Sequence, residues 1–196
     1  MPETAVLGVS APAGTEGRVI AGEDLRIAEA GPVGQVTLRA DLAEPAVAEA
    51  VAAVTGCSLP APLTASFADG NAAVWMATDE LLLILPAEAA AGAVSALESA
   101  LAGHHRLALD VSAARVLFRL SGSLAGEVLA KGAPLDFRDA AFAPGTARRT
   151  HLGQIAVGIW RESPSDWSLV CFRSLSAYVA DWLAETAAPG RAVRHF

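Results

Sequence analysis

The sequence lacks the short motifs by which many enzymes are recognised. It contains no GxSxG, GxGxxG, Walker A or HExxH pattern, so it shows no activated serine, dinucleotide loop, phosphate loop or zinc-binding helix. Its two cysteines, Cys57 and Cys171, form no CxxC pair and lack metal-ligand spacing. Cys171 lies in an apolar run that predicts a small core residue. We therefore expect an α+β protein that is not a self-sufficient enzyme.

Positive charge is also scarce. The 14 Lys and Arg residues are outnumbered by 21 Asp and Glu residues, and the net charge of −7 argues against a nucleic-acid partner. No uninterrupted apolar run reaches the roughly 18 residues of a membrane span, and the start lacks signal-peptide features, so the expected compartment is the cytoplasm. The hydrophobic fraction of 53% is high, partly through alanine. It leaves open whether another subunit covers apolar surface.

The histidines and acids do not predict a metal or catalytic site. His104 and His105 are adjacent in a turn, so they cannot easily bind one ion together, and His195 lies at the chain end. The Asp79–Glu80 pair falls in a predicted hairpin, where a structural role suffices. Asp110 ends a predicted strand without a base, nucleophile or metal ligand beside it. No acid is therefore assigned a catalytic role.

Hydrophobic periodicity predicts the same series of elements twice. A capping box formed by Asp41 and Glu44 is expected to start the first helix, and Ser123 and Ser174 are expected to cap two later ones. Residues 57–70 and 133–146 are predicted loops. The first copy is predicted as a strand at 34–41, a helix at 43–54, a hairpin at 72–86, a helix at 87–102 and a strand at 106–112. The second is predicted as a strand at 116–121, a short helix, strands at 147–162 and 166–172, a helix after 174 and a last strand at 191–196.

The two copies can be aligned residue by residue. Arg39 falls opposite Arg119, Trp75 opposite Trp160, and Asp79 opposite Asp166. The predicted fold class is α+β, with two tandem βαββαβ (ferredoxin-like) units. The predicted division is an N-terminal arm at 1–33, a first unit at 34–112 and a second unit at 113–196, all in one compact domain.

Four segments carry a family resemblance. They read WxxxDELLLILP from residue 75, DVSxxRVxxRLSG from residue 110, KGxPLD from residue 131 and FxPG from residue 142. Together, and in this order, they resemble the gamma subunit of heterotetrameric sarcosine oxidase across roughly residues 31–186. Ala133 departs from the family pattern, which usually has cysteine there, so a thiol role at that position is in doubt.

The resemblance implies a fold similar to the folate-binding domain of the aminomethyltransferase of the glycine cleavage system. It also implies an accessory, non-catalytic subunit of a complex that oxidatively demethylates sarcosine to glycine and transfers the methyl carbon to tetrahydrofolate. The alpha, beta and delta subunits are the implied partners, and they would carry FAD, FMN, NAD, tetrahydrofolate and zinc. Asp110 lies in a segment similar to an acid-bearing D-x-S segment of aminomethyltransferases, but no matching aromatic and arginine clamp is evident here.

The length of the 133–151 loop region and the apolar excess of the chain predict a subunit interface that includes this region and the N-terminal arm. The expected anchors are aromatic and the expected rim is polar. The predicted interface residues are Phe137, Phe142, Arg148, Arg149, His151 and Trp167. Two alternatives stay open: a free-standing folate-binding protein of aminomethyltransferase-like C1 transfer, and, less favoured, a lone regulatory binding module. An acid and stacking aromatics on one concave face would favour the first of these.

Overall fold

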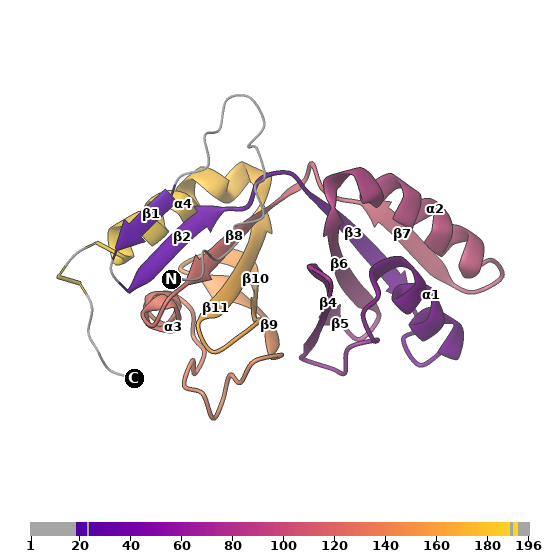
Figure 1. Cartoon of the computed structure of the whole chain (residues 1–196), viewed down its shortest axis with the longest axis horizontal. Coiled ribbons are helices and arrows are strands. Elements are labelled where there is room, and N and C mark those ends of the chain that lie inside the picture. Colours follow the sequence, from indigo (N-terminus) through magenta and orange to yellow (C-terminus); the bar gives the residue numbers. More distant parts are fainter. Residues whose placement is uncertain (1–18, 23, 189, 192–196) are drawn as a thin grey trace.

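The computed structural model describes residues 19–22, 24–188 and 190–191. The first half of the chain builds a five-stranded antiparallel sheet in the order β4-β5-β6-β3-β7, with two helices (Figure 1). Its elements are β3 (Val33–Ala40), α1 (Pro45–Thr55), β4 (Ala65–Ala68), β5 (Asn71–Ala77), β6 (Glu80–Pro86), the 3-10 turn η1 (Ala87–Ala89), α2 (Ala90–Ala100) and β7 (Arg106–Asp110). The order β5-β6-β3-β7 within this sheet is that of a ferredoxin-like unit.

The second half builds a six-stranded antiparallel sheet in the order β1-β2-β8-β11-β10-β9. Its elements are β8 (Arg115–Ser121), α3 (Ala125–Ala130), β9 (Ala147–Leu152), β10 (Ile155–Arg161), β11 (Asp166–Phe172), the 3-10 turn η2 (Arg173–Leu175) and α4 (Ser176–Thr186). The remaining strands, β1 (Val19–Gly22) and β2 (Leu25–Glu29), come from the N-terminal arm. The predicted α+β class with a duplicated unit is confirmed.

Strand β2 occupies the place beside β8 that β7 occupies beside β3. Leu120 of β8 pairs with Ile27 of β2, as Leu38 of β3 pairs with Ala108 of β7. The arm therefore completes the sheet of the second half, which the sequence did not predict. Of the strand expected at 191–196, residues 192–196 lie outside the described part of the chain, as do residues 1–18 and His195.

Gly122 lets strand β2 take this place beside β8. A Cβ at Gly122 would lie 2.2 Å from the carbonyl oxygen of Asp24, immediately before β2, and its φ of 119° is one that other residues rarely adopt. The same Asp24 carbonyl accepts a hydrogen bond from the backbone N–H of Leu124 at 3.2 Å. The glycine thus lets the end of β8 pass close to the start of β2.

The helices cover the outer faces of the two sheets, and the inner faces meet each other (Figure 1). Strand β6 shows the arrangement, because Leu81 and Leu83 pack under α1 and α2 while Leu82 and Ile84 pack between the sheets. Burial on both faces explains the continuous apolar run of this strand. The core between the sheets also contains Trp160, which is 1% exposed.

A short backbone seam joins the two sheets at β4 and β9. Thr64 and Thr146 form an isolated antiparallel bridge. Ala65 donates to the carbonyl of Gly145 at 2.8 Å, and Ala147 donates to the carbonyl of Leu63 at 2.9 Å. The two acceptors have similar left-handed backbones, with φ of 64° at Leu63 and 88° at Gly145. The seam is therefore symmetric and relates the two copies.

The ladders correct the residue alignment of the copies. Ala65 pairs with Val74 on one side of the seam, and Ala147 pairs with Trp160 on the other, so Val74 rather than Trp75 is the counterpart of Trp160. By the same comparison, Thr37 rather than Arg39 corresponds to Arg119, and Glu80 rather than Asp79 to Asp166. Similar side chains had matched one residue out of register at Trp75 and Asp79 and two residues out at Arg39. Hydrophobic alternation did not reveal the slip, because strands such as β6 are buried on both faces.

The predicted helix caps do not form. Helix α1 begins at Pro45, after a Glu44 that makes no side-chain capping bond, and Asp41 instead accepts the N–H of Ala43 in the preceding turn at 3.0 Å. Proline favours this start because its fixed φ suits the first helical position and its missing N–H is not needed there. Ser123 and Ser174 do not cap either, since α3 and α4 follow Leu124 and Leu175. The predicted loop at 57–70 contains β4.

Candidate functional site

The three aromatic residues predicted as interface anchors pack against one another inside the second half. The rings of Phe137 and Phe142 stack with centroids 5.4 Å apart, and Trp167 lies tilted at 5.5 and 5.0 Å from them. Each residue is at most 4% exposed. They therefore set the shape of the 133–146 loop and present almost no surface of their own. Their interface role stays a prediction.

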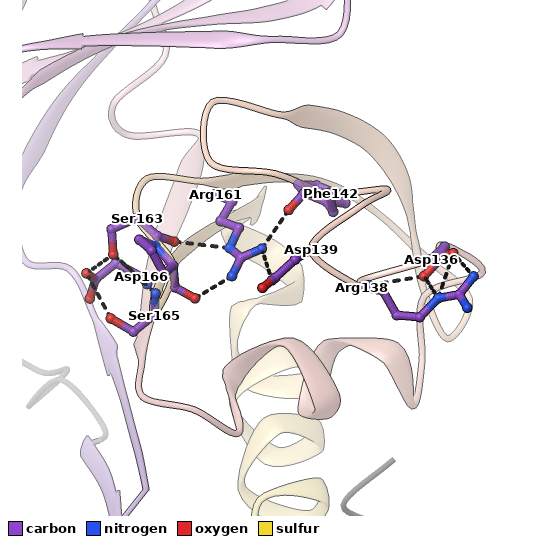
Figure 2. Close-up of polar contacts among 9 residues, drawn as sticks. Asp136, Arg138, Asp139, Phe142, Arg161, Ser163, Ser165 and Asp166 are labelled. Carbon is purple, nitrogen blue, oxygen red and sulfur yellow. Dashed lines mark hydrogen bonds and ion pairs between the residues drawn. The ribbon is translucent and has the colours of Figure 1, made fainter. Parts of the chain in front are cut away.

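Arg161 holds this loop in place (Figure 2). Its side chain is 5% exposed and donates to Asp139 Oδ1 at 2.7 Å and to the carbonyl of Phe142 at 2.8 Å. It also donates to the carbonyls of Ser163 and Pro164 in the turn before β11. Its guanidinium lies 4.8 Å from the centre of the Trp167 ring. The only sequence signal for this residue was a charge at the end of an apolar strand.

Arg148 binds the backbone of both halves. Its Nη1 donates to the carbonyls of Leu63 and Ala147, each at 2.8 Å, and its guanidinium lies 5.7 Å from the centre of the Phe142 ring. This predicted rim residue is therefore largely engaged within the chain. It reinforces the seam between β4 and β9 from the side.

Arg149 and His151 are exposed and line a cleft of about 400 Å³ between the sheets. The cleft crosses the inner face of β9, β10 and β11 and reaches Met76 of the other sheet. Its lining residues are Met76, Arg115, Arg149, Thr150, His151, Ala156, Val157, Gly158, Val170, Cys171 and Phe172. The structure thus brings two of the six predicted interface residues together in a hollow surface.

One carboxylate serves two arginines at this cleft. Glu80, at the start of β6, places Oε1 3.6 Å from Arg115 Nη2 and Oε2 3.9 Å from Arg149 Nη1. The pKa of Arg115 is lowered, chiefly because the side chain is buried. The Glu80 carboxylate opposes this shift, and the positive charge of Arg149 adds to it. Among the described residues, Arg115 Nη1 is buried without a hydrogen-bond partner. The members of this ion triad lie far apart along the chain, so no local pattern in the sequence indicates it.

A second polar cluster on the inner face of the same sheet is centred on Glu162. Its Oε1 accepts hydrogen bonds from Arg119 at 2.5 Å, Ser168 at 2.7 Å and Trp160 Nε1 at 3.2 Å. The cluster satisfies the indole N–H of a nearly fully buried tryptophan. The members of this cluster therefore stabilise the sheet by bonding one another.

The remaining candidates for a catalytic or metal-binding role either hold the fold together or lie apart from one another. Asp110 accepts hydrogen bonds from the backbone and hydroxyl of Ser112, whose hydroxyl in turn accepts the N–H of Gln35 at 2.8 Å. This D-x-S segment therefore joins β7 to β3. Burial raises the pKa of the Cys171 thiol to about 12, so it is a poor nucleophile. Within the described residues no three His, Cys, Asp or Glu side chains gather as for a metal.

The fold and site define a class: a duplicated α+β protein whose polar side chains mostly contact other parts of the same chain and whose hollow surface is basic. No helix in the described ranges is long and apolar enough to cross a membrane. The family model described as "Sarcosine oxidase, gamma subunit family" matches residues 39–189. The chain therefore belongs to the sarcosine oxidase gamma subunit family.

Individual relatives agree. The sarcosine oxidase subunit gamma of Corynebacterium sp. (strain P-1) is 35% identical over 142 residues, which are 71% of this chain and 67% of that protein. A chain of heterotetrameric sarcosine oxidase from Corynebacterium sp. U-96, solved in complex with pyrrole 2-carboxylate, is 29% identical, with a TM-score of 0.78 over 89% of both chains. Glycine cleavage system aminomethyltransferase T from Bartonella henselae matches 79% of this chain and 44% of its own, with a TM-score of 0.58 at 15% identity, and so shows a shared fold.

Proposed function

We propose that this chain is the accessory, non-catalytic gamma subunit of a heterotetrameric sarcosine oxidase. The complex oxidatively demethylates sarcosine to glycine and transfers the methyl carbon to tetrahydrofolate. The observation that carries the proposal is the family match over residues 39–189, together with a likeness that spans 89% of both this chain and a chain of a heterotetrameric sarcosine oxidase.

The way in which the polar side chains are used supports a scaffold role. Arg161 contacts three backbone carbonyls, Arg148 contacts two, and Asp110 stabilises a turn. A catalytic group needs a free functional atom within reach of a substrate. In these three residues the functional atoms instead hold loops and strands, which suits a subunit that presents a shaped surface.

The proposal extends to partners, cofactors and location. The alpha, beta and delta subunits are the partners, and they carry FAD, FMN, NAD, tetrahydrofolate and zinc, with none on this chain. The complex works in the cytoplasm, without a nucleic-acid or membrane partner, in keeping with a net charge of −7. Of the predicted interface residues, Arg149 and His151 contact a partner directly, while Phe137, Phe142 and Trp167 act through the shape of the loop.

Co-expression tests the proposal. The tagged chain is produced with the alpha, beta and delta subunits, and the purified material is analysed by native mass spectrometry and by a sarcosine-dependent peroxide assay. The expected result is a four-part flavoprotein that fails to assemble when this chain is omitted. A chain that stays alone and binds tetrahydrofolate in titration calorimetry would instead support the free-standing C1-transfer protein.

A further inference from the structure

The cleft between the sheets carries more positive than negative charge. Arg115 and Arg149 bring two cations, His151 adds ring nitrogens, and the carboxylate paired with both arginines is that of Glu80. The whole chain, by contrast, has a net charge of −7. An anionic group is therefore attracted to this hollow and repelled by the chain as a whole, which is the condition for selective docking.

Glu80 neutralises these cations incompletely. Its contacts of 3.6 Å to Arg115 and 3.9 Å to Arg149 are longer than the ~2.7–2.9 Å of a charge-assisted hydrogen bond. The Nη1 atom of Arg115 is buried and unpaired among the described residues, which is costly for a charged group. A second carboxylate at Arg149, whose side chain is 55% exposed, would leave Glu80 free to pair with Arg115 alone. The triad thus has two cations and only one carboxylate to pair with them.

The floor and rim of the cleft define what accompanies that anion. In the β9–β10 ladder, His151 pairs with Ala156 and Arg149 pairs with Gly158. Ala156 and Gly158 have little or no side chain, so the floor of the cleft beside the basic residues is open. Phe172, at the end of β11, is 54% exposed on the rim. An occupant with an apolar side chain next to its carboxylate would cover this ring.

The openness of the site selects a polypeptide over a small molecule. Arg149, His151, Ala156 and Phe172 are all exposed, whereas small-molecule pockets bury some 70–90% of their ligand. The cleft also adjoins β9, an edge strand of its sheet, so an extended chain can lie across it. Arg173, the next residue after Phe172, donates to the carbonyls of Ser112, Ala113 and Arg115, which fix its position and leave its positive charge beside the cleft.

We propose that this cleft is the docking site for an acidic segment of a partner subunit. A carboxylate of that segment binds Arg149 and His151, and a neighbouring apolar side chain covers Phe172. This inference rests on the proposed function, because it takes the partner from a sarcosine oxidase complex, and it identifies the surface through which this subunit is held.

Two variants test the docking site within the co-expressed complex. Arg149→Glu reverses the exposed charge, and Ala156→Trp fills the floor without a change of charge. Arg26→Glu, at an exposed arginine on β2 of the same sheet, is the matched control. Retention of the tagged chain by the other subunits is measured against salt concentration, and circular dichroism checks that each variant is folded. The apparent Kd should rise at least ~10-fold for Arg149→Glu and Ala156→Trp, and change less than ~2-fold for Arg26→Glu.

The outcomes separate the docking site from the proposed function. A wild-type chain that forms the four-part complex, with folded Arg149→Glu and Ala156→Trp variants that assemble equally well, overturns the docking site and leaves the subunit assignment intact. A wild-type chain that never assembles overturns both. Normal assembly of the two variants, with benzoate binding to the wild-type chain that Arg149→Glu abolishes, would identify the cleft as a small-carboxylate site and also overturn the proposal.

Discussion

Replacement of Arg161 by methionine should destabilise the protein strongly. The side chain is 5% exposed and donates to the carbonyls of Phe142, Ser163 and Pro164, which would lose a charged donor (Figure 2). Asp139, the fourth acceptor, is 87% exposed and would be solvated by water instead, so its share is small. A buried acceptor that loses its donor costs about 1–3 kcal/mol, so three carbonyls, partly reached by water, should together cost about 3–5 kcal/mol. That is a large part of the stability of a typical domain.

The measurement is urea unfolding followed by tryptophan fluorescence and far-ultraviolet circular dichroism, with linear extrapolation of the free energy of unfolding. A thermal scan should show a Tm lower by roughly 6–20 °C, at about 2–4 °C for each kcal/mol in a chain of this size. Arg138→Met is the matched control, because Arg138 lies in the same loop and its ion pair with Asp136 is exposed. Equal midpoints for the two variants would refute the assignment of Arg161 as the residue that holds the loop.

Three further predictions concern glycine, thiol and carboxylate positions. Gly122→Ala should lower the Tm and speed proteolytic removal of β2, because the added Cβ would lie 2.2 Å from the Asp24 carbonyl oxygen. The control is Gly92→Ala, in α2 with open space around it, which should stabilise the chain by up to about 1 kcal/mol. The raised pKa of Cys171 means that the thiol stays neutral in the folded state while it ionises in the unfolded state. The free energy of unfolding should therefore fall between pH 9 and about pH 12, and Cys171→Ala should flatten that slope; identical slopes in alkaline titrations would contradict the burial argument. Glu80→Gln should cost about 1–3 kcal/mol in urea unfolding, because it leaves two arginines at the cleft without their shared anion, and an unchanged midpoint would show that the triad is not coupled.

Local patterns in the sequence were sufficient to predict most elements of the fold. The alternation around β3 and β5, the apolar run of β6 and the spacing of α2 and α4 each correspond to an element in the structure. The duplicated α+β plan followed from their order. These features depend on neighbouring residues along the chain, so periodicity can reveal them.

Features that depend on distant residues could not be predicted in the same way. The alignment of Trp75 with Trp160 was off by one residue, since two similar side chains matched across opposite faces of a strand. Expected caps such as Ser123 failed because a neighbouring turn started the helix elsewhere. The pairing of Glu80 with Arg115 and Arg149 joins residues of two sheets, and no local pattern encodes such a contact.

The place of β2 beside β8 has a consequence for how the chain can be made. Strand β2 is synthesised before the whole first half, yet its partner β8 begins only at Arg115, and the sheet they share also needs β11, which ends at Phe172. The first half can close its own sheet during synthesis, but the second must wait until β11 has been made. The strand order of the second half is that of a circularly permuted copy of the first, so the two halves cannot be separated by a cut after residue 112.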